Sequence, residues 1–253
     1  MGRVIAITNQ KGGVGKTTTA VNLAACLAAA EKKTLLIDMD PQGNATTGFG
    51  INPYKAEKSI YDALVNGLTV GDVVMKTELP MLDLAPANID LTGAEIELVP
   101  LEHRETRLRS SIQPQKANYE YIIVDCPPSL GLLTLNTLTA ADTILIPMQC
   151  EYYALEGVTR LMSTVELVKK SLNPGIKIEG VLLTMYDART SLCQQVSSEV
   201  RTFFQKRVYD TVIPRNVRLS EAPSHGKPII FYDIKSLGAQ AYLSLAKEVM
   251  ARG

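Results

Sequence analysis

The chain contains the stretch Lys11-Gly12-Gly13-Val14-Gly15-Lys16-Thr17-Thr18. An apolar run precedes it at residues 4–7, and a segment with alanine and leucine at helical spacing follows it at residues 19–30. This order predicts a buried strand, a glycine-rich turn and a helix. Closely spaced glycines let backbone N–H groups close around an anion, and the first turn of the helix adds a positive dipole. The stretch therefore predicts a loop that binds the phosphate groups of a nucleotide.

Two side chains of this loop suit particular parts of a bound triphosphate. We expect Lys16 to lie along the β- and γ-phosphates, and Thr17 to offer its hydroxyl to Mg²⁺, a cation that prefers oxygen ligands. The alternative is a glycine-rich turn whose two lysines are merely solvated. The predicted strand before the turn and the predicted helix after it favour the phosphate-binding loop.

The loop departs from the usual pattern G-x-x-x-x-G-K-[ST], because Gln10 stands where the pattern has its first glycine. It carries a second lysine instead, at the start of K-G-G-x-G-K-T-T. In these residues the chain resembles the deviant Walker A ATPases of the ParA/MinD group. The resemblance implies that residues 11–18 bind ATP, and that Lys11 is the signature lysine, which reaches the nucleotide of the partner subunit in an ATP-sandwiched homodimer.

The rest of the chain predicts one α/β domain over residues 1–253, because no linker or internal repeat divides it. Apolar runs typical of buried parallel strands occupy residues 34–37, 81–86, 121–124, 143–147 and 177–185. Helices are expected at residues 59–64, 91–112, 131–140, 154–170, 190–207 and 237–250. The predicted fold is a single-domain P-loop NTPase, with a mostly parallel twisted sheet and helices on both faces. In the helix at 91–112 we expect a solvated face formed by His103, Arg104, Arg107 and Arg109.

The overall composition excludes several classes of partner. Lys plus Arg and Asp plus Glu number 26 each, so the total charge predicts neither a nucleic acid nor an acidic partner, and either must be sought locally. Four scattered cysteines without a C-x-x-C pair fit a reducing cytosol, and we expect them to be packing residues. The first residues lead directly into the predicted strand, and no apolar run is long enough to cross a bilayer. These features predict a cytoplasmic protein without a membrane partner.

Aspartates follow two of the predicted strands, where a parallel sheet binds its ligands. Asp38 and Asp40 come after the strand at 34–37, and Asp125 closes the strand at 121–124. An aspartate in the position of Asp125 is a Walker B carboxylate that holds Mg²⁺. The sequence D-x-D-P-Q resembles the second motif of the ParA family, which implies that Asp40 positions the attacking water and that Asp38 belongs to the Mg²⁺ shell. The alternative, that one of this pair only caps the next helix, stays open.

The last third of the chain carries two further resemblances. Pro214 and Asn216, in I-P-R-N, resemble the segment of the ParA family that contacts adenine. Residues 189–218 have an excess of four positive charges, which suits non-specific binding to phosphates. Within it, Arg189 and Arg218 match arginines that partition ATPases use for sequence-independent binding of double-stranded DNA. A solvated basic surface is the alternative.

Taken over its whole length, the chain is similar to the ParA/Soj-type chromosome-partitioning ATPases. The resemblance implies a slow, Mg²⁺-dependent conversion of ATP and water to ADP and phosphate. It also implies an ATP-dependent dimer that binds DNA on the nucleoid, and a ParB-type centromere-binding partner that speeds hydrolysis.

Two other functions use the same kind of loop. One is a membrane-cycling spatial regulator of the MinD type, for which the segment 237–250 would have to lie on lipid. It carries few cations, so packing against the sheet is favoured. The other is a metal-cluster reductase of the nitrogenase iron-protein kind, which needs a pair of cysteines shared across a dimer. The positions of Cys126 and Cys150 do not fit that requirement.

Overall fold

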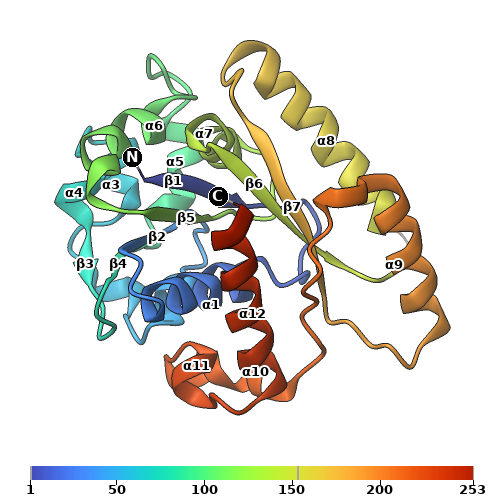
Figure 1. The fold of residues 1–253 in the computed structure, drawn as a ribbon. Coiled ribbons are helices and arrows are strands. Elements are labelled where there is room, and N and C mark those ends of the chain that lie inside the picture. Colours follow the sequence, from blue (N-terminus) through green and yellow to red (C-terminus); the bar gives the residue numbers. More distant parts are fainter. Residues whose placement is uncertain (1, 153, 253) are drawn as a thin grey trace.

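A seven-stranded sheet runs through the computed structural model, which describes residues 2–152 and 154–252 (Figure 1). Its strands are β1 Arg3–Ile7, β2 Thr34–Asp38, β3 Met75–Lys76, β4 Leu82–Ala85, β5 Tyr121–Asp125, β6 Thr143–Gln149 and β7 Lys177–Thr184. They lie in the order β3-β4-β2-β5-β1-β6-β7. Only the short edge strand β3 is antiparallel to its neighbour. The predicted mostly parallel sheet is confirmed.

Helices cover both faces of the sheet, as the sequence predicted. They are α1 Lys16–Ala29, α2 Asn44–Thr47, α3 Ile60–Leu64, α4 Val70–Val73, α5 Leu91–Glu97, α6 Arg107–Ile112, α7 Leu132–Ala140, α8 Ala154–Ser171, α9 Ser191–Phe204, α10 Val217–Glu221, α11 Ile229–Tyr232 and α12 Leu237–Arg252. Short 3₁₀ turns occupy Pro53–Lys55, Gln113–Asn118, Gln205–Arg207 and Ala222–His225.

Successive residues of each strand belong to two separate hydrophobic cores, because side chains alternate between the faces of a sheet. Ile5 and Ile7 pack in the core that α1, α11 and α12 cover. Val4 and Ala6 pack in the other core, to which α3 to α9 contribute. Helix α12 lies against α1, where the hydroxyls of Tyr242 and Thr19 are 3.2 Å apart (Figure 1).

The prediction of one helix over residues 91–112 was wrong, because α5 and α6 are separated by turns. Pro100 disfavours a helical conformation at the preceding residue and has no N–H to donate. His103 has a φ of 55°, in the left-handed region that ends a helix. These two positions account for the break.

Of the residues expected on a solvated helix face, His103 and Arg109 are exposed, whereas Arg104 and Arg107 are partly buried. Arg104, Arg107 and Arg109 donate to the backbone carbonyl oxygens of Val99, Leu64 and Leu172, at 2.8, 2.9 and 3.2 Å. Carbonyl groups at the end of a helix have no partner inside it, so a cation there satisfies them and suits the helix dipole. Arg107 does this for α3, whose last residue is Leu64. Its position makes it a structural residue.

The register of the strands brings the predicted acidic residues to one edge of the sheet. Asp125 pairs with Ile7 of β1 on one side and with Asp38 of β2 on the other. The phosphate loop begins just after β1, so it lies beside both carboxylates. A site at this edge is expected, since parallel sheets bind ligands at the carboxyl ends of their strands.

Replacing Gly180 with alanine should destabilise the fold, because the aromatic ring of Tyr209 and the backbone of Arg207 leave no room for a side chain. A Cβ atom at Gly180 would lie 2.6 Å from the ring and 2.9 Å from the carbonyl oxygen of Arg207. Overpacking of this kind costs about 1–3 kcal/mol, which thermal unfolding would show as a Tm lower by several degrees. Gly175→Ala is the matched control, since its Cβ would meet its nearest neighbour, Asn173, at 3.7 Å. An equal Tm for the two variants would contradict this account.

Candidate functional site

The glycine-rich loop is fixed to the sheet by hydrogen bonds from two neighbouring strands. Gly13 and Gly15 have φ values of 73° and 84°, which other residues rarely adopt, so glycine is needed for the turn. The Thr184 hydroxyl at the end of β7 donates to the carbonyl oxygen of Val14 at 2.8 Å. The Asn9 side chain accepts from the N–H of Lys11 and donates to a carbonyl of β6. Hydrogen bonds within the protein therefore hold the loop in its curved form.

Lys16 is a buried cation at the start of α1, with only 7% of its surface exposed. Its Nζ donates to the carbonyl oxygen of Lys11 at 2.9 Å, across the loop. Burial lowers the pKa of Lys16, while the charges of Asp125 and Asp40 oppose that shift. An anion bound in the loop would stabilise the charged form further. The arrangement suits a phosphate.

Lys11 lies at the rim of the same loop, where its ammonium forms an ion pair with Glu151. Glu151 follows the end of β6, and both side chains are more than one third exposed. Glu151 was missed in the sequence, because the distance of 140 residues between the partners leaves no local signal. The role of Lys11 toward a partner subunit stays a prediction.

Asp125 is fully buried, and both its carboxylate oxygens lack a hydrogen-bond donor among the described residues. Burial, and then the nearby Asp38, raise its pKa well above the usual value, while Thr17 acts in the opposite direction. A buried carboxylate without partners is costly unless a cation or proton joins it. Thr17 and Asp125 therefore fit the Mg²⁺ ion that the sequence predicts. The part of the chain described here holds no cluster of three or more His, Cys, Asp or Glu that could bind a metal.

Asp38 and Asp40 differ in their surroundings. Asp38 is buried and accepts hydrogen bonds from the N–H of Asp40 and from both the N–H and the hydroxyl of Thr46, at 3.1, 2.8 and 2.7 Å. Thr46 lies in the first turn of α2, so Asp38 satisfies an N–H group of that turn, although the N-cap residue of the helix is Gly43. Asp40 instead lines the hollow above the loop, and 8% of its surface is exposed. Asp40 is thus the carboxylate that faces this hollow, while its role toward an attacking water and the membership of Asp38 in a Mg²⁺ shell stay predictions.

A second hollow, of about 230 Å³, lies beside the loop where adenine was predicted. Pro214 and Asn216 line it together with Gly15 and Thr18 of the loop. The structure therefore brings these two residues to the nucleotide loop across about 200 positions of sequence. The side-chain oxygen of Asn216 is buried, and no donor within residues 2–152 or 154–252 reaches it.

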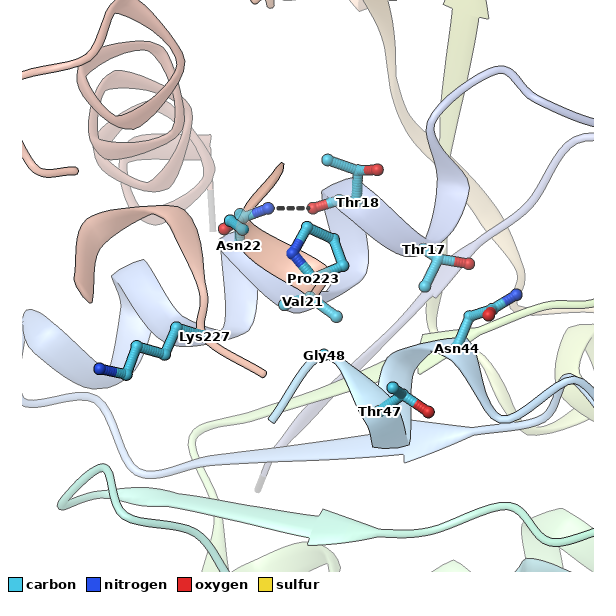
Figure 2. A pocket seen from close by; sticks show the side chains of 10 residues that line it. Thr17, Thr18, Val21, Asn22, Asn44, Thr47, Gly48, Pro223 and Lys227 are labelled. Atoms are coloured by element: carbon cyan, nitrogen blue, oxygen red, sulfur yellow. Dashed lines mark hydrogen bonds between the residues drawn. The ribbon is translucent and has the colours of Figure 1, made fainter. Parts of the chain in front are cut away.

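Sequence analysis missed a third hollow, which Figure 2 shows between the start of α1, helix α2 and the segment after α10. Thr17 and Thr18 line it from α1, and Lys227 lies at its other end. Its wall is held by Asn22, which donates to the Thr18 carbonyl at 2.8 Å and accepts from Ile229. Thr18 lines all three hollows. A polar asparagine inside an alanine-rich helix was the one signal that could have indicated it.

The two arginines predicted to bind DNA lie on segments that meet beyond β7. An isolated bridge between Tyr186 and Pro214 joins these segments. Arg189 is 88% exposed and forms an ion pair with Asp187 at 2.7 Å. Arg218 is 54% exposed and pairs with Glu221 at 2.8 Å. Both arginines are accessible, and each has a carboxylate of the same chain beside it.

The cysteines and helices of the structure bear on the two rival functions. All four cysteines are buried and unpaired, as expected for packing residues. Burial raises the pKa of Cys126 to about 12, so it is an inert thiol. Within the described ranges, no helix is long and apolar enough to cross a membrane.

Comparisons with known proteins agree with the geometry of the site. A family model described as an AAA domain matches residues 2–178. The sporulation initiation inhibitor protein Soj of Bacillus subtilis is 62% identical over 253 residues, which is the whole of both chains. The chromosome partitioning protein ParA of Myxococcus xanthus is 59% identical over all of this chain and 89% of its own. A crystal structure of cobyrinic acid a,c-diamide synthase from Mycobacterium smegmatis, with bound ADP and magnesium, is 37% identical. It covers 99% of this chain and 94% of its own, with a TM-score of 0.87.

Proposed function

This chain belongs to the Soj/ParA family of chromosome-partitioning ATPases, and we propose that it is a switch that dimerises with ATP, binds double-stranded DNA and resets by hydrolysis. The observation that carries the proposal is the buried pair of Lys16 and Asp125 beside a preformed glycine loop. It contains one cation for phosphate and one carboxylate without a partner. The nucleotide and magnesium bound to the related M. smegmatis protein support the same ligands here.

Each residue of the loop has a defined part in binding. The N–H groups of residues 12–18 surround the phosphates, and the Lys16 ammonium lies along them. Thr17, Asp125 and Asp38 would hold Mg²⁺, and Pro214 and Asn216 would contact adenine. The bound ion neutralises negative charge on the phosphate oxygens. Because the loop is already curved, little ordering is needed when ATP binds.

Hydrolysis would use the exposed edge of Asp40, which faces the phosphate hollow. Asp40 accepts a hydrogen bond from a water molecule and thereby orients the water oxygen toward the γ-phosphorus. The water oxygen bonds to that phosphorus and its proton passes to the released phosphate, while the bond from the phosphorus to the bridging oxygen breaks and its electron pair leaves with ADP. Lys16, and Lys11 from the partner subunit, stabilise the charge that develops. A ParB-type partner would speed this step.

Dimerisation would turn two weak DNA-binding surfaces into one stronger surface. Each subunit brings Arg189 and Arg218, so the dimer has twice as many phosphate contacts. Lys11 lies at the rim of the loop, and it would reach the nucleotide of the partner subunit once its ion pair with Glu151 breaks. The protein would therefore lie on the nucleoid in its ATP form and leave it after hydrolysis.

A lipid surface is the alternative to DNA, and the packing of α12 argues against it. The face of α12 that carries Tyr242, Leu245 and Val249 is buried, mostly against α1. Arg252 near its end stacks on Tyr209 at 4.1 Å and pairs with Glu248 at 2.7 Å. A helix that must release these contacts cannot easily lie on a membrane.

The experiment that tests the proposal is co-sedimentation with plasmid DNA or with anionic liposomes, in ADP, ATP and a non-hydrolysable ATP analogue, across a salt series. We expect binding to DNA only with the triphosphates, and an affinity that falls linearly with salt on logarithmic axes. Size-exclusion chromatography of the same samples should show a dimer. Binding to liposomes instead of DNA would identify a membrane-cycling function.

The double variant Arg189→Glu with Arg218→Glu should bind DNA about sixtyfold more weakly per subunit at 0.1 M salt. Two phosphate contacts are removed, and each contributes about eightfold through counterion release at that salt concentration. ATP-dependent dimerisation should persist. Lys206→Glu with Arg207→Glu is the charge-matched control, since both residues lie in the 3₁₀ turn Gln205–Arg207 after α9, outside the segments that carry Arg189 and Arg218. If dimerisation were lost with DNA binding, the two arginines would be structural.

A further inference from the structure

The ion pair of Arg189 has the geometry of a phosphate site. Its Nε donates to Asp187 Oδ1 at 2.8 Å, and its Nη2 donates to Oδ2 at 2.7 Å. This two-pronged contact is the one by which arginine holds either a carboxylate or a phosphate. The N–H of Arg189 also donates to Oδ1, at 3.1 Å, so the aspartate is fixed in place by the backbone. An anion therefore already occupies the fork of this arginine.

A second arginine flanks the same carboxylate from the neighbouring segment. The N–H of Arg215 donates to the carbonyl oxygen of Tyr186 at 3.2 Å, which places Arg215 beside Asp187. The contact with Arg189, and then the charge of Arg215, hold the pKa of Asp187 at about 2, so it is ionised at neutral pH. Arg215 is exposed, and no carboxylate in the described part of the chain forms an ion pair with it.

These contacts leave the three exposed arginines of this surface in different states. Arg189 is paired with Asp187, and Arg218 lies between Glu221 and Asp233, at 2.8 and 3.6 Å. Arg215 alone is not engaged, within the part of the chain that the structure describes. A duplex phosphate that approaches this surface meets Arg215 first, and must compete with a carboxylate for Arg189.

We propose that Asp187 occupies the position of a DNA phosphate between Arg189 and Arg215, and that Arg215 is a third DNA contact. The inference rests on the proposed DNA-binding function and adds two residues to it. Asp187 acts as a competitor that weakens DNA binding by each subunit. Single subunits are thereby kept off DNA, and the additional contacts of the dimer overcome the competition.

Asp187→Asn tests the proposal, since asparagine keeps the size and can still accept from the backbone N–H, but removes the charge. In the complete chain with a non-hydrolysable ATP analogue, DNA affinity should rise about fivefold per subunit, which is the worth of an exposed ion pair of about 1 kcal/mol that no longer has to be broken. The slope of log affinity against log salt should stay nearly the same, because Arg189 neutralises one phosphate in either protein. Arg215→Ala should weaken DNA binding and make the slope shallower by about 0.9 per subunit, because one phosphate contact is lost. Since Arg215 also lines the hollow beside the loop, ATP binding is measured in the same variant. A random-sequence duplex serves as the probe.

Asp210→Asn is the matched control, because it makes the same change in net charge at another exposed aspartate. An equal gain from this control would overturn the inference and leave only a general charge effect. A loss of affinity in Asp187→Asn would also overturn it, and would show that Asp187 positions Arg189 for DNA. If the unchanged chain bound no duplex in any nucleotide state, the proposed function itself would fail, which is a separate result.

Discussion

Replacing Lys16 with alanine should reduce the affinity for ATP about a thousandfold, which corresponds to about 4 kcal/mol. The Lys16 ammonium is buried within the phosphate loop and can contact several phosphate oxygens at low local polarity. Its removal leaves those oxygens without their principal cation. Isothermal titration with ATP and Mg²⁺ measures the loss directly.

The fold itself should tolerate this substitution. Within the described residues, the Lys16 side chain makes one hydrogen bond, to a carbonyl oxygen of the same loop, and its charge is costly to bury. The Tm should therefore stay the same or rise. Lys32→Ala is a suitable control, because Lys32 is an exposed lysine paired with Glu120. Retention of full ATP affinity in Lys16→Ala would mean that the glycine loop does not hold the phosphates.

Replacing Asp40 with alanine should slow hydrolysis about a hundredfold or more and leave nucleotide binding intact. The Asp40 carboxylate lines the hollow but accepts only one hydrogen bond within the described structure, from the N–H of Gln42 at 3.0 Å. It is thus free to orient a water, and it is not needed to build the loop. Because ATP would persist, the variant should accumulate as a dimer on DNA.

The measurements for Asp40→Ala are phosphate release, and size-exclusion chromatography with ATP. Asp210→Ala, at an exposed position outside the hollow, controls for the loss of a carboxylate. Equal loss of ATP binding in Asp40→Ala and Lys16→Ala would contradict the separate roles given to these residues. A variant that stays monomeric with ATP would argue against dimerisation as the step that hydrolysis reverses.

The parts of the molecule that follow from local sequence were predicted well. The phosphate loop is one continuous stretch, and the strands that end in Asp38 and Asp125 are apolar runs closed by an acid. Such signals are contained within a few residues, and the rule that parallel sheets bind ligands at one edge then brings them together. This is why the positions of Lys16, Asp40 and Asp125 could be expected before the structure.

The parts that depend on contacts between distant residues could not be predicted. The pairing of Lys11 with Glu151 spans 140 positions, and no periodicity reports it. The break at Pro100 was overlooked because the apolar spacing continues on both sides of it. Arg107 looked like a surface residue, although its charge is used to satisfy the end of α3. Side chains that satisfy backbone groups elsewhere leave no pattern of their own.

The burial of all four cysteines has a practical consequence for following this protein in solution. The pKa values of Cys26, Cys126 and Cys150 are each raised to about 12, so these thiols react slowly with electrophiles. A single cysteine introduced on the outer side of α9, for example Ser198→Cys, would then take up a maleimide dye before the native ones. A fluorescent reporter can thus be attached while every natural thiol is kept.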